Sequence, residues 1–171
     1  MIRSLDRGVG RVLEALERNG LTENTLVLFT SDNGGHPHYA GNAPLRGSKW
    51  NLYEGGIRIP LIVRWPGKIK AGSTTDHLCY FPDVMPTLAE LSGAKVPNTI
   101  DGISFLPTLL GNGKQKQHDF LYWEYLTQIA VRKDNWKLYR QNEKLGWKLY
   151  DLSTDSMEEK DLASENPALV Q

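Results

Sequence analysis

Apolar side chains recur at helical spacing over the first eighteen residues. They lie three, four or one positions apart and share one helix face: Ile2, Leu5, Val9, Val12, Leu13 and Leu16. Asn19-Gly20 is a typical helix stop. The following run, 25–30, is apolar on both faces, as expected of a buried parallel strand. A helix leading into such a strand predicts half of a βαβ unit.

The middle of the chain alternates between loop and helix signals. Glycine and proline interrupt any period from Gly34 to Asn51, which predicts a long loop of the kind that is usually functional or disordered. Residues 57–63 predict a peripheral or bulged strand, because Pro60 cannot donate to a central ladder. Asp83 is expected to cap a helix that ends before Gly93.

The last third predicts short strands at 120–125, 128–132, 136–140 and 147–150. Trp-Lys-Leu-Tyr occurs at 136 and again at 147, around a polar, glycine-ended connection typical of a hairpin. Trp136 and Trp147 are therefore expected to pack in the core or across the strands. Asp155-Ser156 predicts the start of a helix through Ala163, and Pro167 the start of another.

The apolar run at 25–30 leads directly into Ser31-Asp32-Asn33-Gly34-Gly35. A carboxylate and an amide carbonyl would then lie at the carboxyl end of a strand, where open α/β sheets bind ligands. Such oxygens suit a hard cation such as Ca²⁺ or Mg²⁺. The same run is also typical of a tight turn, so on its own it leaves both interpretations open.

Three further motifs follow in order. They are Arg-Gly-Ser-Lys at 46–49, Tyr-Glu-Gly-Gly at 53–56 with Arg58 and Pro60 after it, and Trp-Pro-Gly at 65–67. Together with the run at 31–35 they resemble the second half of the sulfatase family, in the alkaline-phosphatase-like superfamily. The resemblance implies that Asp32 and Asn33 are metal ligands for Ca²⁺ or Mg²⁺. It implies that Lys49 is catalytic, binding the sulfate and stabilising charge on the departing ester oxygen.

The family's nucleophile segment is missing from this chain. Sulfatases make formylglycine from the first residue of a Cys-x-Pro-x-Arg or Ser-x-Ala/Pro-x-Arg segment. The single cysteine, Cys79, lacks both the proline two residues later and the arginine four residues later. We expect formylglycine in a parent protein but not here. This chain is then expected to be the C-terminal portion, inactive without the N-terminal portion of the same protein.

The resemblance also implies a fold class and its division. We expect a partial α/β sulfatase fold, with a mainly parallel sheet and flanking helices. Residues 1–115 would form the C-terminal part of the catalytic α/β domain. Residues 116–171 would form a small antiparallel α+β subdomain.

Other side chains of the long loop are candidates for substrate binding. His36 and His38 make an incomplete zinc set, and their ability to titrate near neutrality favours substrate contact or leaving-group protonation. Arg46 and Trp50 flank Lys49 and are expected to bind substrate with it, Trp50 lining the sugar or aryl side. The expected substrate is a sulfated small molecule or a sulfated glycan.

Composition limits the classes of partner that we expect for this chain. Twenty basic and twenty acidic residues give a formal net charge of zero, which argues against nucleic acid. No apolar run reaches the roughly 18 residues of a membrane span, and the N-terminus does not read as a signal peptide. The sequence alone does not indicate a compartment, although the resemblance implies a parent that is periplasmic, secreted or lysosomal.

Two alternatives remain open from the sequence. The first alternative is a phosphoric or phosphonic monoester hydrolase of the same superfamily, because a cation and a lysine suit phosphate as well as sulfate. Five tryptophans and seven tyrosines raise the second, a non-catalytic carbohydrate-binding or assembly module.

Overall fold

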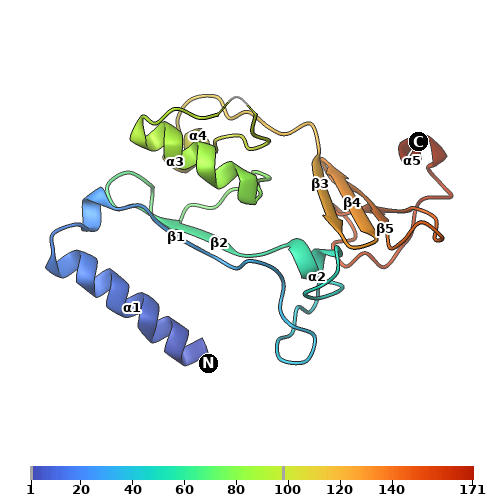
Figure 1. The fold of residues 1–171 in the computed structure, drawn as a ribbon, viewed down its shortest axis with the longest axis horizontal. Coiled ribbons are helices and arrows are strands. Elements are labelled where there is room, and N and C mark those ends of the chain that lie inside the picture. Colours follow the sequence, from blue (N-terminus) through green and yellow to red (C-terminus); the bar gives the residue numbers. More distant parts are fainter. Residues whose placement is uncertain (1, 98) are drawn as a thin grey trace. The chain divides into compact units, whose positions relative to one another are not determined.

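The computed structural model describes residues 2–97 and 99–171 (Figure 1). They form two units, one containing the chain up to Phe29 together with Ile62–Gln117, the other Thr30–Leu61 together with His118–Gln171. The predicted division into residues 1–115 and 116–171 stays a prediction. The loop at 30–61 groups with the C-terminal residues, because its side chains pack on the C-terminal sheet.

The first unit begins with helix α1, Ile2–Arg18, which confirms the helix predicted from the spacing. None of the residues of α1 is buried in this chain. A short 3₁₀ helix, η1 (Thr22–Asn24), leads into strand β1, Val27–Thr30, which pairs with β2, Leu61–Arg64. No helix in the described part of the chain is long and apolar enough to cross a membrane.

The strand predicted at 57–63 is wrong in its first half. Residues Glu54–Ile57 form a helical turn, α2, and the strand begins only at Leu61. The glycine pair within α2 is buried, and neighbouring backbone lies too close to either glycine for a Cβ. Pro60 therefore lies just outside the ladder, and its carbonyl accepts a hydrogen bond of 2.9 Å from Thr30 Oγ1.

Helices α3 (Val84–Ser92) and α4 (Leu106–Leu110) complete the first unit after the 3₁₀ helix η2 (Phe81–Asp83). The sequence suggested that the Asp83 side chain caps α3, but this side chain makes no capping hydrogen bond to α3. Its carboxylate instead accepts hydrogen bonds from the N–H groups of Tyr80 at 2.9 Å and Ile103 at 2.7 Å. The bond to Ile103 ties the segment after Asp101-Gly102 to the start of α3, and α3 ends at Gly93 in the left-handed region, as expected.

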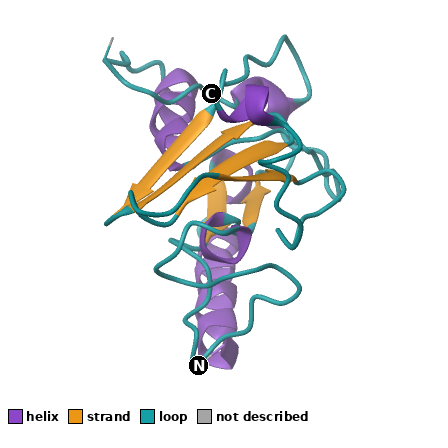
Figure 2. Ribbon diagram, turned by 90° about the vertical axis from the view of Figure 1, so that its right-hand side faces the viewer, coloured by secondary structure: helices purple, strands orange, loops and turns teal. Residues whose placement is uncertain are grey.

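The second unit is built on an antiparallel sheet, and its strands are among those drawn in orange in Figure 2. The strand order is β3-β4-β5-β6. These strands match the four predicted ones and are Leu121–Tyr125, Gln128–Lys133, Trp136–Arg140 and Lys148–Asp151. A last helical turn, α5, covers Pro167–Val170. The helix predicted at 155–163 is wrong. Asp155 does cap a turn, accepting from the N–H groups of Glu159 and Lys160, but Glu158 has a φ of 57° and stops a helix there.

The repeated Trp-Lys-Leu-Tyr segments do pair, but their tryptophans do not. Because β5 and β6 are antiparallel, Trp136 lies opposite Asp151 and Tyr139 opposite Lys148. Trp147 instead lies under the guanidinium of Arg140, 4.7 Å from its ring centroid. A direct repeat placed in an antiparallel hairpin puts equivalent residues at opposite ends of the ladder.

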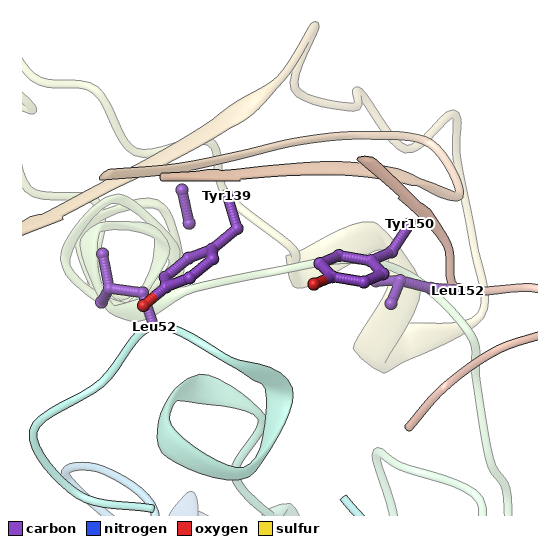
Figure 3. Packing of buried hydrophobic residues seen from close by; sticks show 5 residues of the cluster. Leu52, Tyr139, Tyr150 and Leu152 are labelled. Carbon is purple, nitrogen blue, oxygen red and sulfur yellow. The ribbon is translucent and has the colours of Figure 1, made fainter. Parts of the chain in front are cut away.

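One face of the sheet carries the core of the second unit. Its buried cluster is Leu52, Ala130, Tyr139, Tyr150 and Leu152. Figure 3 shows the rings of Tyr139 and Tyr150 pointing from their strands toward Leu52 and the loop that bears α2. The loop from Arg46 to Arg58 is therefore the cover of this sheet face.

Close backbone approach makes Gly56 a sensitive position. A Cβ there would meet the carbonyl oxygens of Asn51 and Ser48, which cannot move freely. Gly56→Ala should lower the free energy of unfolding by about 2 kcal/mol or more, measured by urea denaturation. Gly41→Ala is the matched control, because a Cβ there meets nothing within 4 Å. Equal unfolding midpoints for the two variants would contradict this packing.

Candidate functional site

The two oxygen-bearing side chains that follow β1 lie side by side. Asn33 Nδ2 donates to Asp32 Oδ2 at 2.7 Å, and Ser31 Oγ donates to the Asn33 carbonyl at 2.8 Å. The residues thus form a turn that presents a carboxylate and an amide together. Among the described residues no group of three or more His, Cys, Asp or Glu could hold a metal ion. Asp32 and Asn33 therefore fit only part of the roughly six to eight oxygen ligands that Ca²⁺ takes.

Backbone hydrogen bonds connect this turn to the rest of the loop. The N–H of Gly34 donates to the carbonyl of Gly56 at 2.8 Å, and a Cβ on Gly34 would collide with the carbonyl of Gly55. The N–H of Lys49 donates to the carbonyl of Gly35 at 3.0 Å. The glycine pairs at 34–35 and 55–56 thus allow their two backbone segments to approach closely. The hydrogen bond from Lys49 to Gly35 places the Lys49 backbone next to the Asp32-Asn33 turn.

Lys49 is a cation without a counter-charge. Its backbone is fixed and its side chain is half-buried, yet its Nζ makes no hydrogen bond or ion pair within the part of the chain that the structure describes. No aspartate or glutamate occurs between Asn33 and Glu54. The loop therefore offers an uncompensated positive charge that suits an anion.

An aromatic cluster lies beside Lys49. The His36 ring has its centroid 4.8 Å from those of Tyr39 and Trp50 and 5.5 Å from that of His38. His36 Nδ1 also accepts a hydrogen bond of 3.2 Å from the N–H of His38. The structure thus brings together His36, His38 and Trp50, three of the predicted substrate-binding residues.

Arg46 is directed to the sheet. Its guanidinium lies over the ring of Tyr53, 4.1 Å from the centroid, and donates to the carbonyl of Glu158 at 2.7 Å. Nη1 also donates to the hydroxyl of Tyr150 at 3.4 Å. These contacts favour a structural role for Arg46, and its part in substrate binding stays a prediction.

A buried ionic network lies under the loop. Lys137 Nζ lies 2.9 Å from Glu54 Oε1 and 2.9 Å from Glu158 Oε1, and the Lys137 side chain is 0% exposed. Glu158 Oε2 accepts from the N–H of Glu54 at 2.6 Å, and Arg132 Nη1 lies 3.8 Å from Glu54 Oε2. Two carboxylates thus face two cations. Burial raises the pKa of Glu158, while Lys137 and the Glu54 N–H act in the opposite direction.

Sequence reasoning missed this network. Alternation along β5 puts Lys137 on the same face as Tyr139, and a lysine on an apolar strand face is the signal that could have drawn attention to it. Its partners are far away in sequence, and Glu54 lies 83 residues earlier. Only the fold identifies them.

Comparison with models of known protein families shows the family to which this chain belongs. Residues 1–94 match the family model for sulfatases, and residues 48–169 match that for the C-terminal part of N-sulphoglucosamine sulphohydrolase. The chain belongs to the sulfatase family. The second match covers Lys49, α2 and the antiparallel sheet, so all three belong to the part of the chain that matches this C-terminal model.

Individual sulfatases are similar in sequence to most of this chain. Steryl-sulfatase of Rattus norvegicus is 40% identical over 156 residues, covering 81% of this chain and 27% of its own length. A sulfatase of Formosa agariphila is 38% identical over 195 residues, covering 98% of this chain and 35% of its own length. The chain thus spans about a third or less of these relatives.

Solved structures share the fold. Ps i-CgsB in complex with k-i-k-neocarrahexaose superposes with a TM-score of 0.87 and 33% identity, over 99% of this chain and 39% of that one. BT4656 in complex with its substrate D-glucosamine-2-N,6-O-disulfate gives 0.83 and 28%, over 99% and 37%. The sulfatase chain therefore has the expected fold class, a partial alkaline-phosphatase-like α/β domain with an antiparallel-sheet subdomain.

The buried network predicts a large stability effect. Lys137→Met should cost about 3–5 kcal/mol of unfolding free energy, because it leaves two buried carboxylates without their shared cation. Lys148→Met is the matched control, since Lys148 holds the same place in the second Trp-Lys-Leu-Tyr segment but is only half-buried. Its effect should stay within about 1 kcal/mol. Similar losses in urea denaturation of both variants would show that the network does not stabilise the fold.

Proposed function

We propose that this chain is the C-terminal portion of a sulfatase that hydrolyses sulfate esters, with Lys49 holding the sulfate. The observation that carries the proposal is that the Lys49 ammonium has no carboxylate partner among the described residues, while the Lys49 N–H donates to Gly35 beside the Asp32-Asn33 turn. A sulfuryl group in transfer spreads negative charge over its outer oxygens. A cation fixed in advance at that position stabilises the charge without reorganisation.

In this proposal Asp32 and Asn33 contribute two oxygen ligands to a Ca²⁺ or Mg²⁺ site. Such a cation, when bound, would neutralise charge on the sulfuryl oxygens. The remaining ligands and the formylglycine nucleophile would come from the N-terminal portion of the same protein. The parent would be an exported enzyme, acting on a sulfated small molecule or glycan.

His36 and His38 supply the proton chemistry of this proposal. Both rings belong to the aromatic cluster that contains Trp50, the residue after Lys49. An imidazole there can donate to the departing ester oxygen or to a hydroxyl of the substrate.

Cys79 is assigned no part in the chemistry of this proposal. Burial raises the pKa of its thiol, and the Asp83 carboxylate raises it further. Both effects disfavour the thiolate, which is the form that a nucleophile needs. This supports a nucleophile from outside the chain.

A second candidate is a phosphoric or phosphonic monoester hydrolase. It is favoured by the structural likeness to the phosphonate monoester hydrolase of Agrobacterium radiobacter, with a TM-score of 0.78 and 26% identity over 99% of this chain and 37% of that one. A lysine and a hard cation serve both anions, so relative affinity for sulfate and phosphate separates the candidates. A non-catalytic binding module would bind sulfated ligands without ever supporting turnover.

The isolated chain should not turn over 4-nitrophenyl sulfate. Without a covalent nucleophile, only positioning and electrostatic stabilisation remain. The measurement is the release of nitrophenol over many equivalents of protein. Multiple turnover that is retained on repurification and lost in Lys49→Ala would overturn the dependence on an external nucleophile.

Lys49 should dominate binding of inorganic sulfate by this chain. In an NMR titration, sulfate should shift the amide signals of Gly35 and Lys49. Lys49→Ala should weaken the affinity about tenfold or more, as expected for loss of a charge-assisted contact. Lys144→Ala, at an exposed position in the hairpin, is the control. Equal affinities of the two variants would remove Lys49 from the site, and tighter binding of phosphate than of sulfate would favour the second candidate.

A further inference from the structure

The turn that carries Lys49 is closed at residues 48–51. The N–H of Asn51 donates to the carbonyl of Ser48 at 3.1 Å, and the N–H of Ser48 donates to Asn51 Oδ1 at 3.1 Å. Lys49 and Trp50 are therefore the two central residues of a β-turn. Trp50 has a φ of 81°, the value expected at the third position of a type II turn. That position ordinarily takes glycine or asparagine, so tryptophan occupies it under strain.

A relaxed form of this turn is available to the sequence. Turning over the peptide between Lys49 and Trp50 would convert the turn to type I, in which neither central residue needs a positive φ. The same rotation would point the Lys49 carbonyl away from Ser48 Oγ, which donates to it at 3.3 Å. The backbone geometry at Lys49 thus depends on which of the two forms the loop adopts, and a contact from outside the turn can decide between them.

One side chain of the sheet makes such a contact. Gln128 Nε2, from β4, donates to the Trp50 carbonyl at 2.9 Å, and Gln128 Oε1 accepts from the N–H of Leu52 at 3.2 Å. Because a backbone carbonyl only accepts and a backbone N–H only donates, these two bonds fix the orientation of the amide. The hydroxyl of Tyr139, a core residue of β5, donates to the same Oε1 at 3.1 Å. Gln128 therefore joins the strained residue of the turn to the buried core of the sheet.

The backbone of Lys49 is thus held on both sides. Its own N–H donates to the carbonyl of Gly35 at 3.0 Å, and the carbonyl of the next residue accepts from Gln128. We propose that Gln128 is a positioning residue for Lys49, which holds the turn at 48–51 in its strained form and so fixes the point from which the lysine reaches the sulfate. The inference rests on the proposed function for the role of Lys49. Gln128 acts only through the turn, and a lysine whose backbone is fixed in advance loses less conformational freedom on binding the anion.

Sulfate binding by the full chain, followed by NMR titration, tests this role. Gln128→Met keeps the length of the side chain but removes its hydrogen bonds, and should weaken the affinity for inorganic sulfate about fivefold. Gln141→Met is the matched control, because Gln141 lies exposed just beyond β5 and its replacement should leave the affinity unchanged. The amide signals of β4 and β5 report in the same spectra whether each variant is folded. Gln128→Asn, one methylene shorter, keeps a polar amide on the strand and should give a similar loss.

Relief of the strain distinguishes positioning from general support of the fold. Glycine adopts a positive φ freely, so in a Trp50→Gly background the turn should no longer need Gln128. Adding Gln128→Met to Trp50→Gly should then change the sulfate affinity by less than about twofold. An equal loss in both backgrounds would overturn the positioning role, because Gln128 would then act on the fold in general.

Two further outcomes separate this inference from the proposed function. Sulfate binding that depends on Lys49 but is unchanged in Gln128→Met and Gln128→Asn would overturn the inference and leave the proposed function standing. Absence of Lys49-dependent sulfate binding in the wild-type chain would defeat the proposed function, and the inference with it.

Discussion

The arrangement of the second unit depends on one buried lysine. Lys137 projects from the central strand β5 into the face that also carries the buried core, with Arg132 opposite it on β4, and there an unpaired ammonium group would cost several kcal/mol. Glu54 and Glu158 both lie 2.9 Å from its ammonium group, and these residues come from segments that are remote in sequence. Satisfying Lys137 therefore requires the loop and the C-terminal turn to close over the sheet together.

The position of the candidate site follows from this closure. Glu54 begins α2, and the next two residues place the Gly56 carbonyl where it accepts the N–H of Gly34. Gly35 in turn accepts the N–H of Lys49. A short series of backbone hydrogen bonds thus runs from the buried ions to the residues proposed to hold sulfate and metal. The position of the proposed sulfate and metal site therefore depends on the buried ion pairs of Lys137.

The sequence pattern correctly predicted the elements that are determined by residues close together in the chain. Periodicity gave α1 and the four strands of the antiparallel sheet, and the motifs gave the family. Prediction failed where contacts outside the local pattern determine the outcome. The glycines of α2 pack on the backbone of residues 46–51, and Glu158 breaks the expected helix where it meets Lys137. The residues named for the site do gather in one loop, except that Arg46 turns to the sheet. Their chemical roles are proposals that sequence and fold support together.

Hydrogen exchange by NMR tests the central claim, that the loop and the sheet form one cooperative unit held by Lys137. In the wild-type chain, the amides of Gly34, Lys49 and Gly55 donate to loop carbonyls and should exchange only through the opening that exposes β4 and β5. Their exchange free energies should then agree with those of the strand amides to within about 1 kcal/mol. Rapid exchange of the three loop amides beside fully protected strands would contradict the account, because the loop would then open without breaking the ionic network.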